Sequence, residues 1–368
     1  MTAPAGAPRT AGRRTRVLVV DDSVVVRGLL SQWIESDPDL ELVGSAADGA
    51  QAIRKLADLG ADVCILDLEM PVMGGMEALP HLLRIAPGLK ILIASRLTQR
   101  GAEITLRALD LGAADYVGKP ESSRLGSAED FRRELLAKAK ALGGAVSETV
   151  GKDAAHATGE TPAPGTLRPL PAFPRQPEIL AIAASTGGPQ ALRQFLERLG
   201  ADWPTPIVLV QHMPAQFTEL LSVHLGKTLA MPVVAGKHGM SLQAGRVHLA
   251  PGDLHMRVAR TGTSACLRLD EGAPENFCRP AADVLFRSVA EAYGDRALGV
   301  VLTGMGRDGL AGSSALVRAG GVVMAQDQAS SVIWGMPGAV TRGGLASVVG
   351  SVDTLAAAAR ALAAGVHP

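Results

Sequence analysis

The chain has 368 residues, in which 36 lysines and arginines balance 36 aspartates and glutamates. This balance leaves no overall field that would attract nucleic acid or an anionic membrane surface, so we expect neither as a partner. The three cysteines, Cys64, Cys266 and Cys278, lack the spacing of a zinc site or a disulfide framework. With no apolar signal segment and no apolar run of about 18 residues, the sequence predicts a cytoplasmic protein that does not insert into membranes.

The length suits two domains. Residues 1–14 predict a disordered tail, and in residues 15–140 short apolar runs alternate with helix-like segments, which is typical of a parallel sheet wrapped by helices. Residues 141–177 are rich in Ala, Gly and Pro and predict a linker. The alternation returns in residues 178–368, where 246–269 is interpreted as an antiparallel hairpin. We therefore expect two α/β domains, the second doubly wound and mostly parallel.

Polar residues follow the apolar runs of the first domain. Asp21 and Asp22, then Asp67, Ser95 and Lys119 each stand where a strand is expected to end. Because the carboxyl ends of parallel strands share one edge, these side chains should meet there. Converging carboxylates favour a hard cation such as Mg²⁺, and phosphorylated Asp67 would need that ion, the Lys119 ammonium and the Ser95 hydroxyl. Taken alone, the D-D-S run is also an ordinary helix cap.

Residues 16 to about 135 resemble the response-regulator receiver domain, a flavodoxin-like (βα)5 fold, in the D-L-E-M-P-V-M-G-G run that starts at Asp67 and in Lys119. The resemblance implies phosphorylation of Asp67 by a histidine kinase, with Mg²⁺ held by Asp21, Asp22 and Asp67. It also makes Tyr116 the rotating switch aromatic of the family, although an ordinary half-buried tyrosine is an equally good interpretation.

Ser185 is the candidate nucleophile of the second domain. The run I-L-A-I-A-A-S-T-G-G-P places it between an apolar strand and a helix, beside the loose backbone amides of Thr186, Gly187 and Gly188. Such amides suit an oxyanion. A serine here could also cap the helix, or the S-T-G-G turn could bind phosphate.

A serine needs a base, and the histidines differ in their context. Only His212 ends an apolar run, P-I-V-L-V-Q, directly before a helix, so it is the candidate base. His224 and His238 are interpreted as structural. His248 and His255 fall on the expected hairpin, where His255 could border the substrate cleft.

Asp253, Asp308 and Asp327 are the candidates for the carboxylate that orients the base. Asp308 is preferred because it lies in a glycine-rich turn after an apolar run, whereas Asp253 has the context of a hairpin turn. The G-x-G-x-x-G pattern at 304–309, with Asp327 downstream, could instead bind a dinucleotide. Too few strands follow it for two nucleotide-binding halves.

Both domains in this order resemble the chemotaxis protein-glutamate methylesterase family. The motifs are A-S-T-G-G-P, V-Q-H-M-P, H-L-A-P-G-D, R-P-A-A-D-V-L-F and L-T-G-M-G-R-D-G. The resemblance implies a serine hydrolase with Ser185, His212 and Asp308 in its triad, and an oxyanion site at the Met305 amide and the Thr186 region. It implies no cofactor in this domain.

The same resemblance implies demethylation of glutamate γ-methyl esters, and deamidation of glutamines, on the cytoplasmic helices of chemoreceptors, switched on by phosphorylation of Asp67. A receiver-linked module that binds nucleic acid is the alternative, but the second half is not basic and has no helix-turn-helix pattern.

The segment N-F-C-R-P at 276–280 lacks the histidine of the family's N-R-H-R-P. There Cys278 could be a nucleophile, although a small buried thiol is the favoured interpretation.

Overall fold

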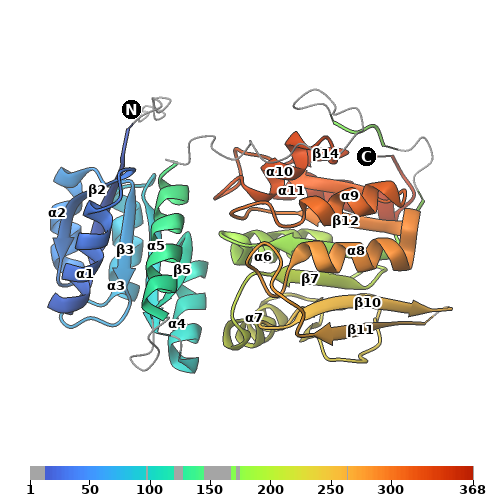
Figure 1. Ribbon diagram of the computed structural model, residues 1–368, viewed down its shortest axis with the longest axis horizontal. Coiled ribbons are helices and arrows are strands. Elements are labelled where there is room, and N and C mark those ends of the chain that lie inside the picture. The colour runs from blue at the N-terminus through green and yellow to red at the C-terminus, as the bar shows by residue number, and fades with distance from the viewer. Residues whose placement is uncertain are drawn as a thin grey trace. The chain divides into compact units, whose positions relative to one another are not determined.

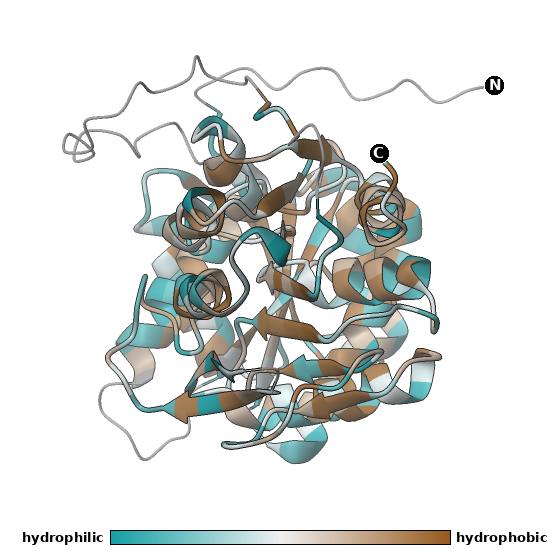
Figure 2. Ribbon diagram, turned by 90° about the vertical axis from the view of Figure 1, so that its right-hand side faces the viewer, coloured by the Kyte–Doolittle hydropathy of each residue, from teal (hydrophilic) through white to brown (hydrophobic). Residues whose placement is uncertain are grey.

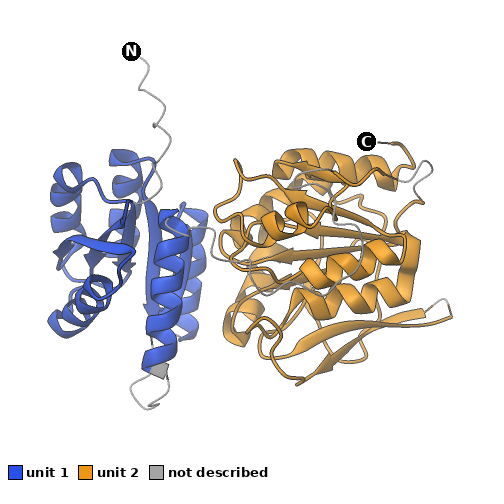
Figure 3. Cartoon of the chain, turned by 45° about the horizontal axis from the view of Figure 1, so that its top comes forward, with its two compact units in different colours: residues 1–157 blue, residues 158–368 orange. Residues whose placement is uncertain are grey.

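The computed structural model describes residues 13–96, 98–119, 127–144, 167–170, 175–262 and 264–367. The chain divides into two compact units, residues 1–157 and 158–368, which Figure 3 colours separately. The expected tail at 1–14 and linker at 141–177 lie largely outside the described residues. None of the helices in the described ranges is both long and apolar enough to span a bilayer.

The first unit is a five-stranded parallel sheet in the order β2-β1-β3-β4-β5, accompanied by helices α1 to α5 in its described residues (Figure 1). Its strands are β1 (Thr15–Val20), β2 (Leu40–Ala46), β3 (Val63–Asp67), β4 (Lys90–Arg96) and β5 (Asp115–Lys119). Its helices are α1 (Val24–Glu35), α2 (Gly49–Leu59), α3 (Gly75–Ile85), α4 (Gln99–Asp110) and α5 (Ser127–Gly143). The (βα)5 prediction is confirmed.

Local sequence explains where these elements begin and end. The Ser23 hydroxyl accepts a hydrogen bond from the Val26 amide at the start of α1, and Asp48 accepts one from Gln51 at the start of α2. The residues of β3 before Asp67 are fully buried, as expected of a central parallel strand covered on both faces. Since β1 and β3 are neighbours in the sheet, their carboxyl ends bring the acidic residues together.

The second unit is built on a seven-stranded parallel sheet in the order β14-β13-β12-β6-β7-β9-β8. Its strands are β6 (Ile179–Ala184), β7 (Ile207–Gln211), β8 (Val233–Ala235), β9 (Val247–Leu249), β12 (Ala297–Val301), β13 (Val322–Gln326) and β14 (Val348–Gly350). Its helices are α6 (Gly188–Leu199), α7 (Ala215–Thr228), α8 (Ala282–Tyr293), η1 (Gly294–Arg296), α9 (Leu310–Arg318), α10 (Met336–Arg342) and α11 (Val352–Ala363). β10 (His255–Thr261) and β11 (Ser264–Asp270) form a separate antiparallel hairpin.

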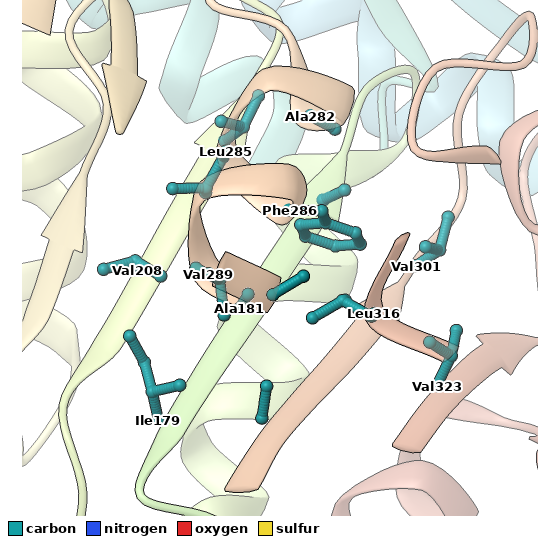
Figure 4. Packing of buried hydrophobic residues seen from close by; sticks show 14 of the residues in the cluster. Ile179, Ala181, Val208, Ala282, Leu285, Phe286, Val289, Val301, Leu316 and Val323 are labelled. Carbon is teal, nitrogen blue, oxygen red and sulfur yellow. The ribbon is translucent and has the colours of Figure 1, made fainter. Parts of the chain in front are cut away.

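A single apolar cluster holds α8 against the centre of this sheet. Phe286 and Leu285 of α8 are fully buried with Val301 of β12 and Leu316 of α9, and Figure 4 shows them packed together. Each such side chain contributes about 1.5–3 kcal/mol through its burial. Strands of this unit are largely brown in the hydropathy colouring of Figure 2, while the surrounding helices carry teal segments. The position of α8 is therefore fixed by its core contacts.

The hairpin prediction needs a partial correction. Residues 247–249 were expected to belong to the antiparallel hairpin, but β9 joins the main sheet parallel to β7. Only β10 and β11 pair in antiparallel fashion, from His255 opposite Asp270 to Thr261 opposite Ser264. A short apolar strand has the same residue pattern in either kind of pairing, so the sequence did not distinguish them.

Candidate active site

An acidic cluster lies at the carboxyl edge of the first sheet. Ligand oxygens of Asp21, Asp22 and Asp67 lie within 4.8 Å of one another. The Lys119 ammonium is 2.7 Å from an oxygen of Asp21 and 2.6 Å from one of Asp67. All four side chains are thus brought to one place, as the strand-end argument predicted.

These residues suit a magnesium ion, because three carboxylates offer only hard oxygen ligands. A single ammonium leaves their negative charge partly uncompensated. Burial raises the pKa of Asp67 above its usual value, and the Lys119 charge opposes this shift without cancelling it. A divalent cation at this place would favour the ionised form of Asp67.

Ser95 and Tyr116 lie on the neighbouring strands. Ser95 is buried, donates to the Gly101 carbonyl at 3.3 Å, and lines a small hollow together with Asp67. Tyr116 is also buried, and burial raises the pKa of its phenol well above the usual value. Its ring lies 5.2 Å from the Lys138 ammonium. Both side chains are therefore buried inside the first unit.

In the second unit, Ser185 follows β6 and precedes α6. Its backbone amide donates to the Thr303 carbonyl at 3.0 Å, and its carbonyl accepts from the Gln211 side chain at 2.9 Å. A Cβ added at Gly304 would lie 2.9 Å from the Ser185 Cβ, so this close approach requires glycine there. The turn that carries Ser185 is therefore held by hydrogen bonds to residues at the ends of the two neighbouring strands.

His212 lies one strand away. β7 pairs with β6 so that Gln211 is opposite Ala184, and the His212 amide donates to the Ala184 carbonyl at 3.2 Å. The Nε2 atom of His212 is 2.7 Å from an oxygen of Asp308. The fold thus brings together the two residues that the sequence predicts as the base and its orienting carboxylate.

Asp308 is buried at the N-terminus of α8. Backbone amides of Ala282 and Asp283, in the first turn of that helix, donate to its two oxygens at 2.6 and 3.0 Å. Burial acts to raise the pKa of Asp308, but the bond to His212 and these amides outweigh it and lower the pKa. The carboxylate is therefore held in its ionised form against the imidazole.

Asn276 joins Asp308 to a second buried carboxylate. Its side-chain amide donates to Asp308 at 3.1 Å and to Asp283 at 2.9 Å. Burial raises the pKa of Asp283, and the charge of Asp308 adds to that shift. Asn276 was not among the predicted site residues, because it lies in an irregular loop whose only available signal was its place in N-F-C-R-P.

The second nitrogen of the imidazole faces a thiol. Nδ1 of His212 lies 3.6 Å from the Cys278 sulfur, and no hydrogen bond joins it to the Ser185 hydroxyl among the residues the structure describes. Cys278 is only half-buried and donates to the Asn276 carbonyl at 3.4 Å, so the interpretation as a simple buried thiol is wrong. Since Nε2 is taken by Asp308, a serine must use the same Nδ1 that Cys278 contacts.

The remaining histidines and aspartates lie apart from this pair. His255 is buried and bonds the carbonyl of Ala273 and the amide of Ala281, so it supports the loop before α8. His248 is buried in β9 and bonds the Ile207 carbonyl. Asp253 lies in a turn with a positive φ of 65°, and Asp327 bonds Ser330. Neither aspartate contacts His212 in the described ranges.

The expected oxyanion site lies close to the serine. Met305 directly follows Gly304, which approaches Ser185, and the Met305 amide donates no backbone hydrogen bond within the described part of the chain. Thr186 is buried, and its carbonyl accepts a hydrogen bond from the Thr303 hydroxyl at 3.0 Å. A donor is thus available next to the candidate nucleophile.

Comparisons with known proteins match each unit to a described domain. Residues 17–128 match the response regulator receiver domain, and residues 180–359 match the CheB methylesterase. The chain is therefore a response regulator whose output domain is a methylesterase. It is 48% identical, over 92% of its length and 96% of the relative's, to protein-glutamate methylesterase/protein-glutamine glutaminase 2 of Caulobacter vibrioides. The chain belongs to the protein-glutamate methylesterase/protein-glutamine glutaminase family.

A second relative and a solved structure are also similar to this chain. The enzyme of that family name from Maricaulis maris is 45% identical, with 91% of this chain and 92% of the relative covered. The crystal structure of the Thermotoga maritima CheB methylesterase catalytic domain matches 50% of this chain and 97% of its own, with 35% identity and a TM-score of 0.49.

Proposed function

We propose that this chain demethylates glutamate γ-methyl esters, and deamidates glutamines, on the cytoplasmic helices of chemoreceptors, and so resets sensory signalling. The observation that carries the proposal is the 2.7 Å bond between His212 and Asp308, one strand away from Ser185. Its named relatives carry both activities in their names. Its free cysteines suit a reducing compartment, and we place the chain in the cytoplasm.

The proposed reaction is acyl transfer through a covalent intermediate. Neutral His212 takes the Ser185 proton at Nδ1 while its Nε2–H donates to Asp308. The serine oxygen attacks the ester carbon, and the Met305 amide and the Thr186 region stabilise the oxyanion. The methoxy group leaves with the proton from His212 as methanol, and water then releases the glutamate carboxylate.

The test of this activity is methanol release from receptor-containing membranes that have been methylated beforehand. The full chain should release methanol, and the same membranes without methyl esters should yield none. Receptors carrying glutamine at those positions should release ammonia. If neither product appears, the proposed function is wrong.

We further propose that a histidine kinase phosphorylates Asp67 and thereby activates the hydrolase. Asp21, Asp22 and Asp67 would hold Mg²⁺, whose charge favours binding of the phosphodonor. Lys119 would pair with the phosphoryl group, and Ser95 and Tyr116 would respond to it. Residues 141–177 are proposed as the connection through which the two domains change their packing.

Replacing Asp67 by alanine should abolish activation. With a small phosphodonor such as acetyl phosphate, the wild-type rate of methanol release should rise about tenfold, whereas Asp67→Ala stays at the basal rate. Exposed Asp58 on α2 gives the control, since Asp58→Ala should still respond. Equal stimulation of Asp67→Ala would contradict the switch.

Cys278 should set the pH dependence of the hydrolase. Burial acts to lower the pKa of His212, but its bonds to Asp308 and Cys278 outweigh this and raise the pKa to about 10. Because the deprotonated imidazole is the base, kcat/KM should rise with pH from neutral toward that value. In Cys278→Ala one of the raising contacts is gone, so the midpoint should fall by about one pH unit.

The check is kcat/KM for methanol release measured across this pH range. Cys266→Ala is the matched control, because Cys266 is a half-buried free thiol of β11. If the pH dependence of kcat/KM has the same midpoint in the wild type and Cys278→Ala, the thiol does not raise the pKa of His212.

A further inference from the structure

Phe277 occupies a backbone conformation that its residue type disfavours. Glu275 and Cys278 exchange two backbone hydrogen bonds, of 3.1 and 2.9 Å, around the two residues between them. Those residues, Asn276 and Phe277, have φ angles of 52° and 62°. Two positive φ values are those of a type I′ turn, whose second central position favours glycine. Asparagine tolerates this region, whereas a bulky phenylalanine does so rarely.

The Phe277 side chain gains nothing from packing within the chain. Its relative exposure is 102%, which is the highest among the large apolar side chains described. The stability of the folded chain therefore does not explain why a phenylalanine stands in this strained turn. Outliers of this kind concentrate where a protein meets a ligand or partner.

The turn is rigidly attached to the catalytic groups. Glu275 pairs with Arg287 through two contacts of 2.7 and 2.5 Å, Asn276 bonds Asp308, and Cys278 contacts His212. Phe277 is the only residue of the turn whose side chain is left to solvent among those described. A rigid aromatic group loses little conformational entropy when it binds.

A second apolar group lies on the loop opposite this turn. A cavity of about 430 Å³ is lined by Asn276 from the turn and by Arg307 from the loop that contains Asp308. Met305 of that loop is 37% exposed. The Arg307 side chain is exposed and forms no ion pair with the described residues. The turn and the loop of Asp308 therefore both line this cavity, and each also exposes an apolar side chain beside it, Phe277 or Met305.

We propose that Phe277, Met305 and Arg307 form the surface that docks the substrate protein. The partner is the protein that bears the glutamate ester, and it presents an apolar side chain to Phe277 and an acidic one to Arg307. The inference rests on the proposed function. Phe277 is continuous with the residues that hold His212 and Asp308, so a protein bound there brings its own side chains to Ser185.

The test compares two substrates and two substitutions at Phe277. The substrates are methylated receptor membranes and a short soluble peptide with one glutamate γ-methyl ester, which is too small to span the surface. In Phe277→Ala the ratio of kcat/KM on membranes to that on the peptide should fall about tenfold, mainly through KM. Val223→Ala is the control, since Val223 is 48% exposed on α7 of the same unit and its loss should leave the ratio unchanged.

Phe277→Gly removes the aromatic ring without disturbing the backbone of the turn, so it distinguishes a loss of docking from a loss of structure. Glycine suits the positive φ, so this variant should melt at the wild-type temperature or higher while showing the same tenfold loss. Arg307→Glu should lower the ratio further, and more strongly at low salt. The inference is wrong if Phe277→Gly keeps the wild-type ratio, or if both substrates lose activity in parallel.

The two proposals fail in distinguishable ways. If wild-type enzyme releases methanol and the Phe277 variants keep its ratio, only the docking surface is refuted. If the wild type releases no methanol from either substrate, the esterase proposal itself has failed.

Discussion

Ser185→Ala should lower methanol release by about 10³-fold or more, because the variant has no oxygen nucleophile while the Asp308–His212 pair remains. The serine side chain makes no hydrogen bond among the described residues, so the melting temperature should be unchanged. The measurement is initial-rate methanol release under phosphodonor, together with thermal unfolding. Ser222→Ala is the control: Ser222 is a buried serine of α7 that donates to the Glu219 carbonyl, and its loss should cost little activity.

This experiment also distinguishes the two possible nucleophiles. Cys278, not Ser185, is the residue in contact with Nδ1 of His212 in the structure. For the serine to act, its hydroxyl must rotate toward that nitrogen, as often happens when a substrate binds. Retained activity in Ser185→Ala together with complete loss in Cys278→Ala would assign the chemistry to the thiol.

Asp308→Asn should lower kcat by about 10³- to 10⁴-fold and also destabilise the second unit. Its two oxygens accept five hydrogen bonds, from three backbone amides, the Asn276 amide and His212. An asparagine turns one acceptor into a donor that faces other donors. His212 loses its fixed orientation, and the free energy of unfolding should fall by about 1–3 kcal/mol.

Asp327→Asn is the matched control for that substitution. Asp327 also follows a strand of the same sheet, but it bonds only Ser330 through its side chain among the described residues. Its loss should change kcat little. The measurements are methanol release and urea unfolding. If both variants lose activity equally, Asp308 has no special role at the imidazole.

The comparison of sequence with structure separates two kinds of residue. Asp21, Asp67, Ser185 and His212 could be found because each ends a strand, and parallel strands bring those ends to one edge. This rule needs only the alternation of apolar and polar segments. It also fixed the two α/β units, which the observed sheets confirm.

Residues outside that rule were harder to find. Asn276 and Cys278 lie in a loop without periodicity, and His255, at the start of β10, bonds the segment before α8. Their partners lie far away along the chain. Asp308 was preferred from its glycine-rich turn after an apolar run, but its contact with His212 is tertiary and no local pattern encodes it. For the same reason residues 247–249 were assigned to the wrong kind of strand pairing.

The five hydrogen bonds on Asp308 have an evolutionary consequence. A gene copy released from selection for hydrolysis would still need this carboxylate to close the start of α8, whereas the Ser185 hydroxyl could drift freely. Inactive paralogues should therefore retain aspartate at 308 long after serine at 185 has been replaced. Loss of the serine would then mark the loss of catalysis, and loss of the aspartate would mark the later loss of a stable fold.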